Sequence, residues 1–157
     1  MVRQSIFLHS RVRHAFGPVA AGDLNGDCLP DLLYGTHDGE QPRAIAYLND
    51  GGTFRKTDLD LKGMPDAIGA LGLVDLDGDY RLDIAVGNLF GARETALYQG
   101  SGNNAFDLAQ KISMSKVVFG FAFADYSGDG WIDAFASHWD IAAPAGTGAR
   151  PDAECRR

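Results

Sequence analysis

The stretch DLDGDYRLD, at residues 75–83, has close counterparts in DLNGDCLPD at 23–31 and DYSGDGWID at 125–133. Each stretch carries an oxygen-bearing side chain at its first, third, fifth and ninth positions and a glycine at its fourth. Oxygen ligands at this density are what a hard cation such as Ca²⁺ takes from a short loop. The three loops begin 52 and then 50 residues apart, and this regular period predicts a repeat protein.

The composition of the 157-residue chain is globular, with 45% hydrophobic residues and 20 glycines. Its net charge is −7, and ten aspartates stand at the oxygen positions of the three loops. Nucleic-acid binding requires a basic face, which this acidic balance does not supply. No segment approaches the ~20 apolar residues of a membrane-spanning helix. We therefore expect neither nucleic-acid binding nor membrane insertion.

The sequence on either side of the loops also repeats. Short apolar segments that contain an early glycine precede the loops, at 16–21, 68–74 and 119–124. Second apolar segments follow the loops directly, at 31–35, 83–87 and 133–137. Short apolar runs bounded by glycine favour buried strands over helices. Each loop is therefore expected to connect the two strands of a β-hairpin.

The first two units continue with further strands. A third strand is expected at 44–48 and at 95–98, followed by a turn at 49–52 or 100–104 and a fourth strand from Phe54 or Phe106. Four antiparallel strands in about fifty residues form one blade of a β-propeller. The predicted fold class is therefore all-β, an incomplete propeller of about three blades.

The expected organisation follows from this unit. It comprises the outer strand of a preceding blade at 1–10, blade 1 at 14–60, blade 2 at 66–112, a partial blade 3 at 115–140 and a disordered tail at 141–157. Because a propeller closes with 4–8 blades, we expect either a fragment of a longer propeller or a homo-oligomer that completes a ring.

The unit resembles the FG-GAP/VCBS repeat of integrin α-subunit propellers and of many bacterial secreted and surface proteins. Phe16-Gly17 and Phe119-Gly120 match its FG element, and the loops match its pattern D-x-[DN]-G-D-G-x-x-D. Ala124-Asp125-Tyr126 and Leu97-Tyr98 look closest to the bacterial branch of VCBS and ASPIC/UnbV-type proteins. The resemblance covers about residues 5–140.

The resemblance implies up to three Ca²⁺ ions, one in each loop. The implied side-chain ligands are Asp23, Asn25, Asp27 and Asp31; Asp75, Asp77, Asp79 and Asp83; and Asp125, Ser127, Asp129 and Asp133. The implied backbone ligands are the seventh-position carbonyls of Leu29, Arg81 and Trp131. The turn in each loop would come from Gly26, Gly78 and Gly128.

Two loops depart from the family pattern at the sixth position, where Cys28 and Tyr80 replace the glycine that Gly130 keeps. If that position needs a positive φ, a side chain there costs roughly 1–2 kcal/mol. Ser127 offers a hydroxyl, which is a weaker ligand than a carboxylate. The second loop, with four carboxylates, should have the most favourable charge, and the first should have the poorest geometry.

Two other interpretations of the loops are weaker. An EF-hand requires a bidentate glutamate at position twelve, where this chain has Tyr34, Val86 and Ala136. Acidic turns that bind no ion are disfavoured because convergent carboxylates repel one another unless a cation neutralises them. We expect the ions to be structural, fixing the hairpins, rather than to carry a signal.

The chain has no nucleophile elbow, phosphate-binding loop, zinc-protease helix or dinucleotide fingerprint. We therefore expect a non-catalytic structural or binding module for adhesion, with a protein or glycan ligand. The family implies an extracellular or cell-surface location, although no signal peptide is visible. Two alternatives stay open: an accessory propeller of a larger secreted hydrolase or lyase, and a self-assembling propeller fragment.

Overall fold

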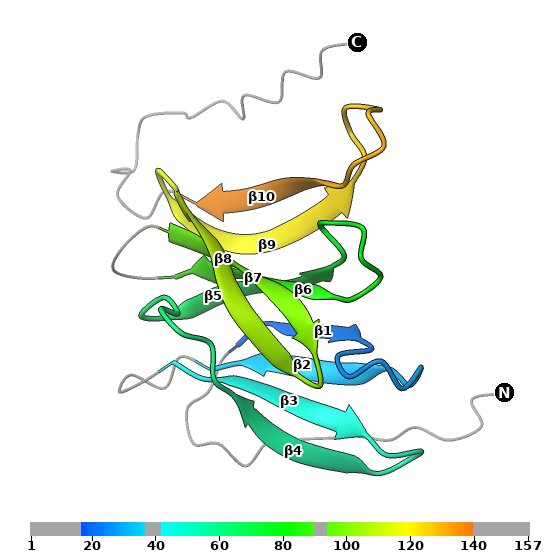
Figure 1. Ribbon diagram of the computed structural model, residues 1–157. Coiled ribbons are helices and arrows are strands. Elements are labelled where there is room, and N and C mark those ends of the chain that lie inside the picture. The colour runs from blue at the N-terminus through cyan, green and yellow to red at the C-terminus, as the bar shows by residue number, and fades with distance from the viewer. Residues whose placement is uncertain (1–16, 37–41, 90–93, 140–157) are drawn as a thin grey trace, which may run out of the picture.

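A computed structural model describes residues 17–36, 42–89 and 94–139, which form ten β-strands and no helix (Figure 1). The strands are β1 (Val19–Gly22), β2 (Asp31–Gly35), β3 (Ala44–Asn49), β4 (Phe54–Leu59), β5 (Ile68–Val74), β6 (Asp83–Asn88), β7 (Glu94–Gly102), β8 (Ala105–Ser113), β9 (Val117–Ala124) and β10 (Asp133–Trp139). No helix among these residues has the length and apolarity needed to cross a membrane. The all-β prediction is confirmed.

The strands form three antiparallel sheets, and sequential strands are neighbours in each of them. The sheets have the orders β1-β2-β3-β4, β5-β6-β7-β8 and β10-β9. A four-stranded sheet built from consecutive strands is a propeller blade. The predicted incomplete propeller is therefore confirmed, with two four-stranded blades and one hairpin of a third among the described residues.

Each acidic loop closes a hairpin in the same register. The ninth residue of each loop pairs with the residue just before the loop: Asp31 with Gly22, Asp83 with Val74 and Asp133 with Ala124. Because the three registers agree, the three loops occupy equivalent places in their sheets. Figure 1 shows all three loops on the same side of the molecule.

The first strand begins later than predicted. It was expected from residue 16, but β1 starts at Val19, after Gly17 and Pro18. Proline lacks the N–H that a strand interior needs, although the carbonyl of Pro18 still accepts a 3.0 Å hydrogen bond from the amide of Gly35. Phe16, the expected first residue of the strand, lies outside the described residues.

The turn of the second unit is shorter than the predicted 100–104. Strand β7 continues to Gly102, which pairs with Ala105. The two residues between them, Asn103 and Asn104, have φ values of 52° and 60°. Two consecutive positive φ angles match the two-residue type I′ hairpin turn, which asparagine tolerates.

The sheets stack, with β5 against β1 and β2, and β9 against β5 and β6. The main core lies between the first two sheets, where Leu33 and Leu48 of the first meet Ile84, Val86 and Tyr98 of the second. All five side chains are fully buried. Burying an aliphatic or aromatic side chain of this size contributes about 1.5–3 kcal/mol, so inter-sheet packing holds the blades together.

Glycines allow the innermost strands to approach closely. A Cβ added to Gly35 would lie 2.6 Å from a methyl carbon of Ile68, and one added to Gly69 would lie 2.5 Å from the carbonyl oxygen of Val118. The first contact joins sheets one and two, and the second joins sheets two and three. The backbones could not come this near with any larger residue.

The strand predicted at 1–10 and the tail predicted at 141–157 lie outside the described residues. The exact limits of the three blades along the chain stay predictions.

We predict that Gly69→Ala lowers the free energy of unfolding by about 1–3 kcal/mol, because the new methyl overpacks the contact with the Val118 backbone. Urea denaturation would measure the loss. Gly120→Ala is the control, since its Cβ would meet a movable hydroxyl, that of Ser137, at 3.2 Å. Equal losses in the two variants would contradict the close approach of β5 and β9.

Candidate metal centre

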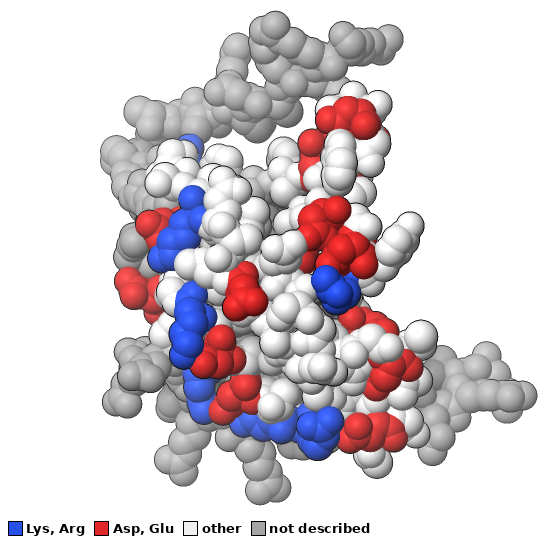
Figure 2. Space-filling view, in the orientation of Figure 1, with Lys and Arg blue, Asp and Glu red and all other residues white. Residues whose placement is uncertain are grey.

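The acidic side chains gather where the three hairpin loops lie. Figure 2 shows acidic side chains along the side on which Figure 1 places the β1–β2, β5–β6 and β9–β10 loops, and it shows others, next to lysine and arginine, on the opposite side. Each loop folds around the aspartate at its first position. In the second loop, Asp75 Oδ1 accepts hydrogen bonds from the amides of Gly78 at 2.7 Å and Asp79 at 3.2 Å, and Oδ2 accepts one from Tyr80 at 2.9 Å. The first carboxylates of the other two loops accept from the equivalent amides.

This folding needs positive φ angles at two positions of each loop. At the fourth position, Gly26, Gly78 and Gly128 have φ values of 81°, 77° and 76°. At the sixth, Cys28, Tyr80 and Gly130 have 66°, 67° and 90°. The glycine turn and the positive φ at position six are thus confirmed, and the two side chains there carry a strain of roughly 1–2 kcal/mol each. The first two loops therefore have similar φ values at both positions, and the expectation that the first loop has the poorest ligand geometry stays a prediction.

The backbone amides of the first and third loops also lower the pKa of the aspartate at the first position. The N–H groups of Gly130, Gly128 and Asp129 lower the pKa of Asp125 below its ordinary value. Burial raises the pKa of Asp23, but the amides of its loop outweigh that effect and the pKa is lowered. Both groups are therefore anions near neutral pH, the form in which a carboxylate binds a cation.

The aspartate at the ninth position connects its loop to the third strand of the sheet. Asp83 is 3% exposed. Its Oδ2 accepts from the amide of Leu76 at 2.8 Å, and its Oδ1 accepts from the amide of Gly100, on β7, at 2.9 Å. Burial raises the pKa of Asp83, and the two hydrogen bonds oppose that shift. We call this arrangement the carboxylate latch.

The same latch occurs in the first loop. Asp31 is fully buried and accepts from the amides of Leu24 at 2.9 Å and Asn49, on β3, at 2.7 Å. In the third loop, Asp133 is half-buried and accepts two amide hydrogen bonds from its own loop, each 2.9 Å long. The ninth position was predicted as a ligand alone, and its latch was missed. The partner on the third strand is 17 or 18 residues away, so the loop sequence does not contain that signal.

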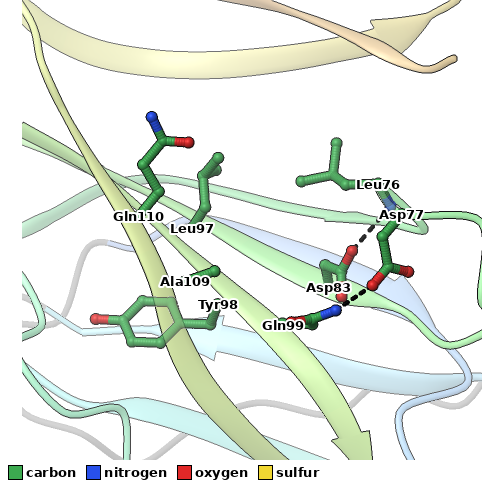
Figure 3. Close-up of a pocket in the computed structure, with 8 residues that line it drawn as sticks. All are labelled: Leu76, Asp77, Asp83, Leu97, Tyr98, Gln99, Ala109 and Gln110. Atoms are coloured by element: carbon green, nitrogen blue, oxygen red, sulfur yellow. Dashed lines mark hydrogen bonds between the residues drawn. The ribbon is translucent and has the colours of Figure 1, made fainter.

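The second loop brings three of its predicted ligands together. One carboxylate oxygen each from Asp75, Asp77 and Asp83 lie within 4.8 Å of one another, a spacing that a single ion can bridge. Within the described residues, the first and third loops do not gather three carboxylates this closely. An all-oxygen donor set fits Ca²⁺. Figure 3 shows Asp77 and Asp83 side by side at one end of a pocket of about 210 Å³ whose other walls include Leu97 and Ala109.

Carboxylates at the third and fifth positions of the first two loops already have side-chain partners, and Asp77 of the cluster is one of them. Asp77 accepts a hydrogen bond from the side-chain amide of Gln99 (Figure 3). Asp79 accepts from the backbone amide of Arg81 at 2.8 Å and is ion-paired with the guanidinium of the same residue. In the first loop, Asp27 accepts from the Asn25 side chain at 2.8 Å. Gln99 and the side chain of Arg81 were missed, because only the backbone carbonyl of position seven was predicted to matter.

The other predicted ligands lie within their loops. Ser127 hydrogen-bonds to the side chain of Asp125, and Asp129 accepts from the amide of Trp131 at 2.9 Å. The Trp131 side chain is 60% exposed. That the carbonyls of Leu29, Arg81 and Trp131 are ligands stays a prediction.

We predict that Asp83→Ala lowers the free energy of unfolding in EDTA by roughly 2–4 kcal/mol, because it leaves two amides, those of Leu76 and Gly100, without their acceptor. Chemical denaturation in EDTA separates this effect from any metal. Asp133→Ala is the matched control at the same loop position, where the carboxylate is half-buried and the loss should stay below about 1 kcal/mol. A small loss for Asp83→Ala would contradict the latch.

Comparison with known families gives one match. A family model described as an FG-GAP-like repeat matches the chain twice, over residues 23–86 and 75–136. The first match begins at the first loop and the second begins at the second loop, so the matched unit coincides with the spacing of the loops. No curated protein matches the chain.

Proposed function

Because the chain belongs to the FG-GAP-like repeat family, we propose that it is a calcium-stabilised propeller module that binds a partner and has no catalytic activity of its own. The observation that carries calcium binding is the convergence of Asp75, Asp77 and Asp83 within 4.8 Å. Three carboxylates this close repel one another, and a divalent cation among them removes that repulsion.

The residues that would hold the ions are the first-, third-, fifth- and ninth-position side chains of each loop. A bound Ca²⁺ supplies positive charge and links several oxygens, and it performs no reaction. Asp83 already joins its loop to β7, and Asp31 joins its loop to β3. A cation on the same carboxylates would therefore stiffen the connection between the first hairpin and the third strand in the first two sheets.

This role favours a location outside the cell or at its surface. Extracellular calcium modules bind at about 10⁻⁴–10⁻³ M, and we expect a dissociation constant in this range. The stiffened blades would present their exposed loop residues, including Tyr80 at 97% and Trp131 at 60% exposed, to a protein or glycan ligand. An adhesion role and closeness to the bacterial VCBS and ASPIC/UnbV-type branch are part of this proposal.

We predict that Ca²⁺ raises the melting temperature of the chain. At 10 mM Ca²⁺, a site with a dissociation constant of about 1 mM contributes about 1.4 kcal/mol, which corresponds to a rise of roughly 3–6 °C. Circular dichroism melts in EDTA, Ca²⁺ and Mg²⁺ would measure it, and Mg²⁺ should do less because it dehydrates reluctantly.

Asp75→Asn should reduce the calcium-dependent rise, whereas Asp107→Asn, which changes an exposed aspartate of β8 outside the loops, should preserve it. A folded protein whose melting temperature is the same in EDTA and in Ca²⁺ would contradict calcium binding.

A second proposal, self-assembly through the open face of the last sheet, rests on exposed aromatic residues there. Phe119 of β9 and Phe135 of β10 are 46% and 62% exposed. At the opposite end of the stack, Val19 of β1 is 60% exposed. The described sheets already stack in sequence, so the β1 end of one copy would continue the stack on β9 and β10 of another.

Sedimentation velocity should then give a mass at least twice that of the monomer at about 100 μM, because burial of these side chains favours association. Phe135→Ser should shift the distribution towards monomer. Tyr126→Ser, which removes a 60% exposed aromatic from the third loop and not from the sheet face, is the control. A monomer at every concentration would contradict self-assembly.

A further inference from the structure

Arg81 is held at two points beside the second loop. Its guanidinium Nη2 is ion-paired with Oδ2 of Asp79, and its Nε donates a 3.0 Å hydrogen bond to the carbonyl of Gly100 on β7. The Asp79 side chain is only 25% exposed. An exposed ion pair is weak mainly because both long side chains must be ordered to form it. Here the second contact already restrains the guanidinium.

The other two loops have no such cation at the equivalent position. Position seven is Leu29 in the first loop and Trp131 in the third, and neither side chain is charged. Their fifth-position aspartates accept hydrogen bonds from neutral groups of their own loops. Four further ion pairs among the described residues lie outside the loops: Arg43–Asp58, Arg55–Asp50, Lys62–Asp60 and Lys111–Glu94.

The ion pair changes what the second loop can offer a metal. This loop has four carboxylates, but Asp79 is absent from the cluster that Asp75, Asp77 and Asp83 form. Asp79 accepts from the amide of Arg81 with one oxygen and is ion-paired with its guanidinium through the other. Within the described part of the chain, the three clustered carboxylates accept only from neutral amide groups. The most acidic of the three loops therefore presents three carboxylates together with a positive charge.

We infer that Arg81 is a built-in counter-cation of the second loop: it satisfies Asp79 internally, weakens Ca²⁺ binding at this loop and keeps the loop folded without an ion. The inference rests on the proposed calcium binding. A bound ion either tolerates the guanidinium nearby or displaces it, and both routes lower the affinity. A single positive charge roughly 6 Å from a divalent ion in water weakens binding by about tenfold.

The same contacts support the metal-free loop. Arg81 bonds to the carbonyl of Gly100, and the amide of Gly100 bonds to Asp83. Asp79 and Asp83, the fifth and ninth positions, are thus joined through one residue of β7. The latch and the counter-cation together hold this loop to its sheet by contacts made only of protein atoms.

The test is a Ca²⁺ titration of the full 157-residue chain, labelled with ¹⁵N, in which fourth-position glycine amides report each loop separately: Gly26, Gly78 and Gly128. Arg81→Gln removes the charge and keeps a polar side chain. We expect the dissociation constant read at Gly78 to fall about tenfold, with the other two loops unchanged. In EDTA the melting temperature of Arg81→Gln should be lower than that of the parent chain.

The matched control is Arg55→Gln. It removes the same charge from an exposed residue of β4 that pairs with Asp50 at 3.6 Å, away from the loops. It should leave the three dissociation constants as they were. Leu29→Arg provides an independent arm, because a cation introduced at position seven of the first loop should weaken binding at Gly26 by about tenfold.

The outcomes separate the inference from the proposed function. If calcium shifts Gly26 and Gly128, but Arg81→Gln leaves binding at Gly78 unchanged or weaker, the counter-cation is overturned and calcium binding stands. If Arg81→Gln does not fold, unchanged calcium binding in Leu29→Arg overturns the inference. If no glycine amide responds to millimolar Ca²⁺ in the parent chain, the proposed function fails and the inference falls with it.

Discussion

The two hydrogen bonds that a buried aspartate makes at the end of each of the first two loops determine the arrangement of everything around them. Asp83 binds the amide just inside its own loop and the amide of Gly100 on β7, and Asp31 does the same with β3. A buried carboxylate without such partners would carry a large desolvation penalty. The loop, the hairpin that it closes and the third strand are therefore fixed together, and the chelating shape comes from backbone amides.

With the first- and ninth-position carboxylates fixed in this way, the loops differ in which groups donate hydrogen bonds to the carboxylates at the third and fifth positions. The first loop uses the neutral side chain of Asn25, and the second uses Gln99 and Arg81. The number of carboxylates in a loop is thus a poor measure of the charge that a cation meets there. Neighbouring cations and amide donors decide that charge: Asn25 and Arg81 stand within their own loops, whereas Gln99 comes from β7.

The bounds of the strands were predicted correctly where a strand directly adjoins an acidic loop. Strands β2 and β5 have the bounds expected for them, 31–35 and 68–74, because an acidic loop ends or begins beside each one. The β7–β8 turn was misplaced, since a register shift between Gly100 and Gly102 moves it to the two asparagines that follow. Such a shift depends on the partner strand, and no local pattern encodes it.

The residues of the candidate site show the same difference between what the local sequence predicts and what only the folded sheet determines. Positions within one loop were predictable from spacing, and the positive φ at position six followed from the family pattern even where Cys28 and Tyr80 stand. The latch partners were not predictable, because they lie on a strand that only the folded sheet brings close. The second sheet alone contacts both other described sheets, through β5 and β6. If its loop carries its own cation, that central sheet can order without metal.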